Sequence, residues 1–178
     1  MKTIPSPTPE EYAEFYAGYV QRAQAHGDVF AALSKQIEDL KAALGTLTDE
    51  QAQIRDAPGE WSIKEVIGHL NDGERVFSYR LLRISRNDAT PLPGFEQNDF
   101  VREAGFDAHP FKDILQEFEH LRRANILAIR NMRDDAVLRL GSASGFAVSS
   151  RALIYIMVGH VDHHLASLHE KYLPNIPQ

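Results

Sequence analysis

YIMVGHVDHHLASLHEKY, residues 155–172, is an apolar stretch that nevertheless carries four histidines. Residues spaced by three and four positions lie on one face of an α-helix. Here they are Leu153, Met157, His160, His164 and Leu168. The stretch therefore predicts a helix from about residue 150 to residue 172, with His160 and His164 one turn apart on its buried face.

Three further long helices are predicted from apolar spacing and capping signals. Residues 29–44 carry apolar side chains at helical spacing. Ser62 and Glu65 form the pattern of a capping box, which starts a helix that runs to about residue 86. A helix over 111–133 is predicted from the inward positions Phe111, Leu115, Phe118, Leu121, Ile126 and Ile129.

The remaining segments predict one short helix at the amino end and two connections. A capping box that begins at Thr8 predicts a short extra helix within an extension formed by residues 1–28. Residues 87–110 hold five Pro and Gly residues and predict a long connection with a short helix near 96–103. The segment GSASGFAVSS, 141–150, predicts a polar turn, and almost nothing in the sequence is typical of a strand.

These elements predict an all-α four-helix bundle with a short extra N-terminal helix. With 178 residues the chain is long enough to bury a substantial core as one domain. The domain is expected to span 1–178, with the bundle itself at about 29–172. In such bundles, metal and cofactor sites lie between facing helices, which gives the positions of the histidines a particular interest.

Composition excludes several classes of function. The formal charge of −6 disfavours a nucleic-acid partner, whose binding requires a basic surface. The sequence has no cysteine, so any metal site must use His, Asp or Glu. No apolar run resembles a signal peptide or a membrane span, and we expect a cytoplasmic protein without a membrane partner. Local basic positions at helical spacing are interpreted as solvated helix faces, namely Arg80, Arg83, Arg86, Arg122 and Arg123.

A third histidine, His69, lies on the predicted inward side of the helix over 62–86. Three neutral imidazoles, His69, His160 and His164, with one or more waters would form an open metal site of the catalytic kind. The alternative is that all three are core histidines held by hydrogen bonds. The pair on one helix favours a metal, because two buried imidazoles on adjacent turns compete for hydrogen-bond acceptors.

Two segments also resemble a known family. GEWSIKEVIGHL, residues 59–70, resembles the Trp-Ser/Thr-x-x-Glu-x-x-x-His-Leu signature of the DinB-like (DinB/YfiT-type) superfamily of four-helix-bundle metalloproteins. VGHVDHHLASL, residues 158–168, resembles its C-terminal His-x-x-His-His element, whose first and last histidines are ligands. The order of elements agrees from about residue 30 to residue 172.

The resemblance implies that His69, His160 and His164 bind a divalent metal ion, with nickel or zinc expected. It also implies a bundle of the up, up, down, down type that is frequently a homodimer. Some relatives use the metal to activate a low-molecular-weight thiol such as bacillithiol or mycothiol, and the resemblance extends that expectation to this chain as one possibility.

Two other residues are candidates for a role beside the metal. Asp72, three positions after His69, is placed to accept a proton from a ligand ring or a metal-bound water, although a solvated position is the simpler interpretation. His163 is interpreted as a neighbour of the ligands or as a surface residue. Asp162 and the remaining histidines are expected at the surface, and four aromatic residues are candidates for a pocket wall or for peripheral core: Phe95, Phe100, Phe106 and Phe111.

Two functions remain open from the sequence. The first is a metal-dependent enzyme that activates a water or a small thiol and acts on a small molecule, as a transferase or a hydrolase. The second is a non-catalytic, metal-stabilised bundle that serves as a binding or stress-response module. The substrate and the oligomeric state depend on loops and surfaces whose geometry local sequence patterns do not specify.

Overall fold

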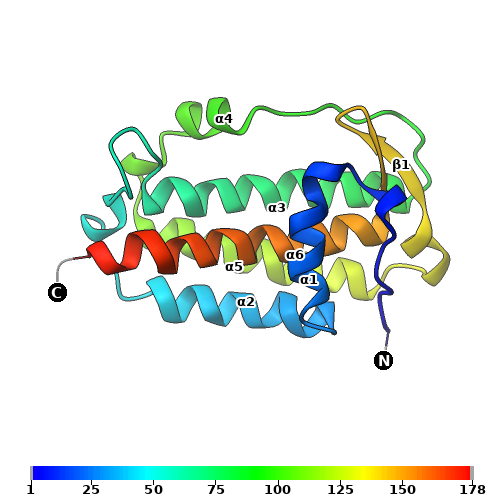
Figure 1. The fold of residues 1–178 in the computed structure, drawn as a ribbon, viewed down its shortest axis with the longest axis horizontal. Coiled ribbons are helices and arrows are strands. Elements are labelled where there is room, and N and C mark those ends of the chain that lie inside the picture. The colour runs from blue at the N-terminus through cyan, green and yellow to red at the C-terminus, as the bar shows by residue number, and fades with distance from the viewer. Residues whose placement is uncertain (1, 177–178) are drawn as a thin grey trace.

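Four long helices lie side by side along the long axis of the molecule (Figure 1). They are α2 (Val29–Leu44), α3 (Ile63–Ser85), α5 (Phe111–Arg130) and α6 (Ser150–Ser167). The structure is a computed structural model that describes residues 2–176. It confirms the predicted four-helix bundle. In the described range, no helix is both long enough and apolar enough to cross a membrane.

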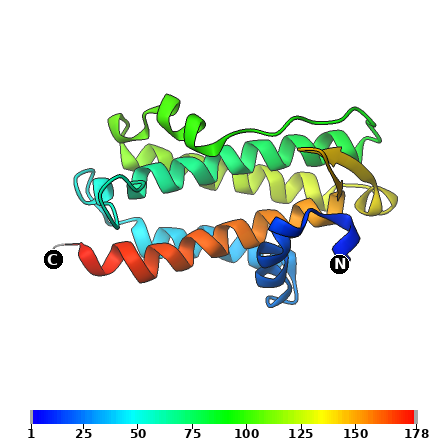
Figure 2. The ribbon, with the colours of Figure 1, turned by 45° about the horizontal axis from the view of Figure 1, so that its top comes forward.

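The helices run in a different order of directions from the expected up, up, down, down arrangement. In chain order they run down, up, up and down, so that α3 and α5 are parallel (Figures 1 and 2). The cause is the long connection after α3, which returns along the bundle before α5 begins. It carries α4 (Gln97–Ala104) and the 3₁₀ turn η4 (Phe106–Ala108).

The N-terminal segment forms a shorter helix than predicted. Two 3₁₀ turns, η1 (Pro9–Glu11) and η2 (Glu14–Tyr16), precede α1 (Ala17–Gln24). The predicted capping box is present, since Glu11 Oε1 accepts a hydrogen bond from Thr8 N at 3.2 Å, but it opens only the turn η1 and not a longer helix. The Glu11 carboxylate also accepts hydrogen bonds from Ser149 Oγ at 2.6 Å and from Arg151 Nε at 2.8 Å. These contacts hold the segment against the start of α6.

Helix α1 crosses the face of α6 (Figure 1). The crossing depends on Gly159, because a Cβ atom added there would lie only 1.9 Å from the carbonyl oxygen of Tyr19. A side chain at this position would push the helices apart. Gly159 therefore allows the aromatic residues of the N-terminal segment to approach the histidines of α6.

The predicted polar turn over 141–150 is wrong, because the segment forms a β-hairpin. Strand β1 (Leu140–Ala143) pairs antiparallel with β2 (Phe146–Ser149). Ser144 and Gly145 both have positive φ, 54° and 83°, as a tight two-residue hairpin turn requires. Leu92 of the long connection bonds to the edge of β1, since its N–H donates to Ser142 O at 2.9 Å.

Short turns complete the described chain. Three further 3₁₀ segments are η3 (Gln51–Gln53), η5 (Asp134–Leu138) and η7 (Leu173–Asn175). The predicted helix over 111–133 ends at Arg130, and the predicted end of the last helix is a π-helical segment, η6 (Leu168–Tyr172).

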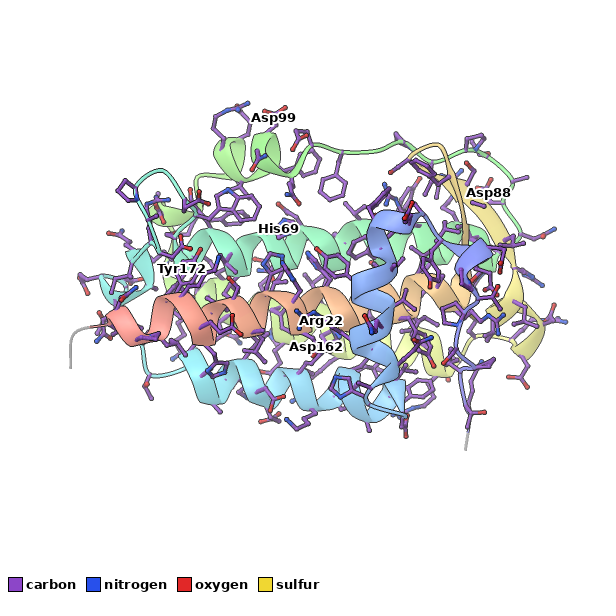
Figure 3. The ribbon with its side chains drawn as sticks, viewed as in Figure 1. Arg22, His69, Asp88, Asp99, Asp162 and Tyr172 are labelled. Carbon is purple, nitrogen blue, oxygen red and sulfur yellow. The ribbon has the colours of Figure 1, made fainter. Side chains whose placement is uncertain are left out.

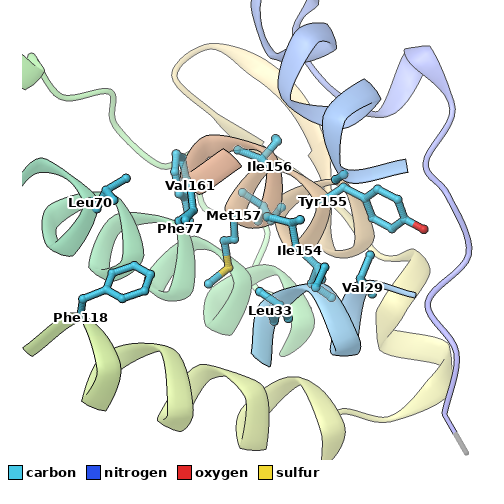
Figure 4. Packing of buried hydrophobic residues seen from close by; sticks show 14 of the residues in the cluster. Val29, Leu33, Leu70, Phe77, Phe118, Ile154, Tyr155, Ile156, Met157 and Val161 are labelled. Atoms are coloured by element: carbon cyan, nitrogen blue, oxygen red, sulfur yellow. The ribbon is translucent and has the colours of Figure 1, made fainter. Parts of the chain in front are cut away.

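The core lies between the four long helices, and α6 contributes its largest continuous share. Figure 4 shows side chains of α2, α3, α5 and α6 packed together, among them Leu33, Leu70, Phe118, Ile154 and Met157. All five are 0 or 1% exposed. Helix α6 is buried on nearly every side over its first half, which explains why its apolar pattern is almost continuous.

The prediction of solvated basic faces is wrong for two arginines. Arg80 is only 3% exposed and Arg122 is completely buried. Arg122 takes the inward position that the sequence analysis gave to Leu121, which is only half-buried. The reason is tertiary, because Arg122 has a buried acidic partner on a neighbouring helix.

Candidate metal centre

Helix α3 supplies the first histidine of the site. Ser62 caps its N-terminus, as its Oγ accepts a hydrogen bond from Glu65 N at 3.1 Å, and Glu65 Oε2 accepts one from Ser62 N at 2.8 Å. The capping box therefore fixes where the helix starts and which residues face the core. His69 lies on the core-facing side at 3% exposure, as predicted.

Helix α6 supplies the other two histidines. Ser149 caps this helix, and its Oγ accepts a hydrogen bond from Ala152 N at 3.0 Å. His160 and His164 follow on one face, with ring centroids 4.8 Å apart. His160 is 5% exposed, and His164 is half-buried nearer the surface.

The structure brings the three predicted ligands together. His69 Nε2 and His160 Nε2 lie 2.9 Å apart, and one ligand nitrogen from each of the three rings lies within 4.8 Å of the others. Figure 3 marks His69 on α3, which faces α6 across the bundle. The arrangement is a cluster of imidazole nitrogens of a kind that can hold one metal ion.

The electrostatics of the cluster also suit a cation. Burial, together with the neighbouring histidines, lowers the pKa of His69 to about 4 and that of His164 to about 3. Burial likewise holds the pKa of His160 well below its usual value. All three rings are therefore neutral near pH 7 and keep an unprotonated nitrogen, which is the form that binds metals. The donor set fits a divalent ion such as nickel or zinc.

Aromatic rings enclose the cluster. The Trp61 ring lies 4.9 Å from the His69 ring, and the rings of Tyr19 and Phe77 each lie 5.5 Å from that of His160. Gly73 lies directly under His160, since an added Cβ would be 2.8 Å from its Cε1 atom. The rotation of the His160 ring is thus limited by its neighbours.

A cleft of about 430 Å³ opens onto His69 and His160. Its other walls come from the N-terminal segment, α3, the long connection and the hairpin. Aromatic side chains predominate among them, namely Phe15, Tyr16, Tyr19, Phe77, Phe95 and Phe146. A small molecule of mainly apolar character can therefore reach two of the three histidines.

The other candidates are placed differently. Asp72 is half-buried and burial raises its pKa, but no hydrogen bond or ion pair joins it to a histidine in the described chain. His163 is exposed, and its ring lies 5.0 Å from that of His164 and 5.5 Å from that of Tyr19. The four remaining histidines are exposed, as expected: His26, His109, His120 and His169.

The four aromatic candidates on the long connection divide between the two interpretations. Phe95 lines the cleft beside the histidines, whereas Phe111 is buried in the core and contributes nothing to it. Phe106 packs on α3 over Gly68, where an added Cβ would overlap its ring. Phe100 is 44% exposed and stacks near Phe95, with ring centroids 5.1 Å apart.

A buried polar network beside the site was not predicted from the sequence. Arg122 donates to Glu74 Oε1 at 2.5 Å and to Gln36 Oε1 at 2.8 Å. Gln36 in turn donates to Asp162 Oδ1 at 2.7 Å, so Asp162 is not the solvated residue expected from its position. The sequence did indicate that Arg122 faces the core, because it lies four residues after the inward-facing Phe118 on the same helix.

Comparisons with known proteins agree with this fold. The sequence profile of the DinB superfamily matches residues 32–168, so the chain belongs to this superfamily. A protein of Geobacillus thermodenitrificans named "Putative metal-dependent hydrolase" is 25% identical over 149 residues, which cover 83% of this chain and 84% of that protein.

Two solved structures share the fold. YfiT from Bacillus subtilis, described as "a probable metal-dependent hydrolase with an unusual four-helix bundle topology", superposes with a TM-score of 0.72 at 16% identity, covering 92% of this chain and 90% of its own. A mycothiol-dependent maleylpyruvate isomerase superposes with a TM-score of 0.67 at 15% identity, covering 84% of this chain and 63% of its own.

Proposed function

We propose that this chain is a metal-dependent enzyme in which His69, His160 and His164 hold one divalent ion, nickel or zinc. The convergence of three neutral imidazoles, two of which line an aromatic cleft, carries the proposal. The similarity to the Geobacillus protein and to YfiT, which are both described as metal-dependent hydrolases, supports it. Imidazole nitrogens suit both ions.

When bound, the ion supplies the Lewis acidity that lowers the pKa of a water or a low-molecular-weight thiol near neutral pH. The chain contributes the surroundings. Tyr19 and Phe77 flank His160 and exclude bulk water from one side of the cluster, while the cleft binds and orients a small molecule. The proposed reaction is hydrolysis of that molecule or transfer of a thiol to it.

A catalytic ion is favoured over a purely structural one by the buried network of Arg122. Through Gln36, Glu74 and the backbone carbonyl of Met157, Arg122 bonds to α2, α3 and α6 from α5. The four helices are thus already joined without the histidines. We therefore expect the metal-free chain to stay folded, with a melting temperature only a few degrees lower.

The test is elemental analysis of the purified, untagged chain, with His160→Ala and His164→Ala as site variants. His120→Ala is the matched control, because His120 is exposed on α5. We expect about one equivalent of nickel or zinc in the native chain and in the control, and a large loss in both site variants. Full metal retention in His160→Ala, or no metal in the native chain after reconstitution, would overturn the assignment.

A further inference from the structure

A second cavity adjoins the cleft that opens onto the histidines. It has a volume of about 300 Å³ and lies between α3 and the long connection. Gly94 and Phe95 of the connection contribute to the walls of both hollows. A bound molecule can therefore extend from the second cavity into the cleft along Gly94 and Phe95.

Arg80 lines this second cavity and is only 3% exposed. Its Nη2 donates to the carbonyl oxygen of Pro93 at 2.8 Å and to Ser144 Oγ at 2.9 Å. Neither partner is charged. Within residues 2–176, no carboxylate forms an ion pair with Arg80. A cation this deeply placed without a counter-charge is costly unless a ligand supplies one.

Other arginines near this cavity are neutralised. Arg75, which also lines it, pairs with Glu117, and Arg83 pairs with Asp88. Arg80 differs in a second respect, since its Nε and Nη1 atoms form no hydrogen bond in the described chain and neither atom is fully enclosed. These donors remain available to an anion that enters the cavity.

The surroundings of Arg80 favour an anion with an apolar or aromatic body. The guanidinium carbon lies 6.0 Å from the centroid of the Phe95 ring, and Phe100 stacks beside Phe95. Tyr79 and Leu92 complete the apolar walls. A carboxylate on Arg80 would therefore leave the rest of its molecule against these side chains.

Arg80 and the histidine cluster lie along one face of α3. His69, Gly73, Phe77 and Arg80 are spaced by four, four and three residues, and Gly73 lies under His160. At 1.5 Å per residue, Arg80 is about 10 Å along the helix axis from Gly73. A molecule of moderate length can thus place its anionic end at Arg80 and its other end at the cluster.

We propose that Arg80 is the anion-binding subsite of this protein, and that the substrate carries a carboxylate on an aromatic or apolar body. The proposal rests on the proposed function only where it names the bound molecule as the substrate. The binding of the anion itself is independent of any metal.

The test is a ¹H–¹⁵N NMR titration of the metal-free chain with 3-phenylpropionate and with 3-phenylpropionamide, its uncharged counterpart. We expect the carboxylate to bind about tenfold or more tightly than the amide, with shifts centred on Gly94 and Phe95. Arg80→Gln should bring the two affinities to within about twofold. Arg75→Gln is the matched control and should keep the preference, because Glu117 already neutralises Arg75.

Equal affinities of the native chain for the two probes would overturn the subsite, and this comparison decides alone if Arg80→Gln does not fold. A folded Arg80→Gln chain that keeps the preference would overturn it as well. Inorganic phosphate that binds as tightly as 3-phenylpropionate would refute the aromatic or apolar body. A chain that binds no metal but keeps the preference would refute the proposed function and leave the anion subsite intact.

Discussion

His69 and His160 are 91 positions apart in the sequence, yet their Nε2 atoms face each other at 2.9 Å between two antiparallel helices. Gly73 makes this approach possible, because it leaves the space that the His160 ring occupies. The His160 ring can therefore pack directly over the backbone of α3, beside the His69 ring.

Gly73→Ala should weaken metal binding without unfolding the chain. The added methyl group would displace the His160 ring, whose Cε1 lies 2.8 Å from the new atom, whereas alanine favours the helix by about 1 kcal/mol. We expect the metal dissociation constant, measured by competition with a chelator, to rise about tenfold or more. Gly18→Ala is the control, as nothing lies within 4 Å of its added Cβ; an unchanged affinity in Gly73→Ala would contradict the packing argument.

Trp61 should report metal binding directly. It is the single tryptophan of the chain, and its ring lies 4.9 Å from the His69 ring. We expect nickel to quench its fluorescence and the change to saturate near one equivalent, whereas magnesium, which prefers oxygen ligands, should have no effect. If a His160→Ala/His164→Ala chain shows the same saturating quench, the nickel is bound elsewhere.

Arg122→Met should destabilise the chain strongly. Arg122 is fully buried and its partner Glu74 is 2% exposed, so the substitution leaves an uncompensated buried carboxylate. We expect the free energy of unfolding, measured in urea, to fall by about 3–5 kcal/mol. Its neighbour Arg123 is the control: it is half-exposed and pairs with Glu119, so Arg123→Met should cost less than about 1 kcal/mol.

The double variant Arg122→Met/Glu74→Met separates the charge from the packing. With both charges absent, no buried ion remains unpaired, and part of the lost stability should return. A double variant that is less stable than Arg122→Met alone would mean that the other hydrogen bonds of the network matter more than the charge pair.

The ion pair between Glu11 and Arg151 should make stability depend on pH in acid. Hydrogen bonds from Arg151 lower the pKa of Glu11 from its ordinary 4.5 to about 2. Between these values the unfolded chain binds more protons, so the stabilisation is complete above pH 4.5 and is lost as the pH falls toward 2. Allowing for solvent screening, we expect the free energy of unfolding to be about 1–2 kcal/mol lower at pH 3 than at pH 7 because of this pair, as measured by urea unfolding at the two pH values.

Glu11→Gln should remove this dependence, because a glutamine cannot titrate. Its stability at pH 7 should fall toward the value that the native chain has in acid. Glu14→Gln, at an exposed position on the same segment, is the control and should unfold as the native chain does. An acid profile of Glu11→Gln that parallels the native profile would assign the loss of stability to other carboxylates.

Local sequence patterns predicted the helices and the three clustered histidines. The capping box at Ser62 predicted the start of α3 to within one residue, and the spacing in α6 placed His160 and His164 on one face. Both features depend on residues within a few positions of one another, where helical geometry fixes the outcome. That these histidines bind metal stays a prediction.

The hairpin over 140–149 shows where local patterns were insufficient. Its strands have four residues each and contain small side chains, so no alternation of polar and apolar residues stands out. Its position is set partly by Leu92, which bonds to the edge of β1 from a distant part of the chain. Such pairing depends on the packing of the whole domain.

The sequence by itself determined the four long helices of this protein, because capping and helical spacing act over a few residues. The tertiary structure decided the directions of the helices, the burial of Arg122 beside Glu74 and the lack, among the described residues, of a carboxylate that pairs with Arg80. The cost of burying a charge depends on which groups surround it, and those groups come from segments far apart in the chain. For that reason the histidine cluster could be predicted from its helices, whereas the charged residues around it could not.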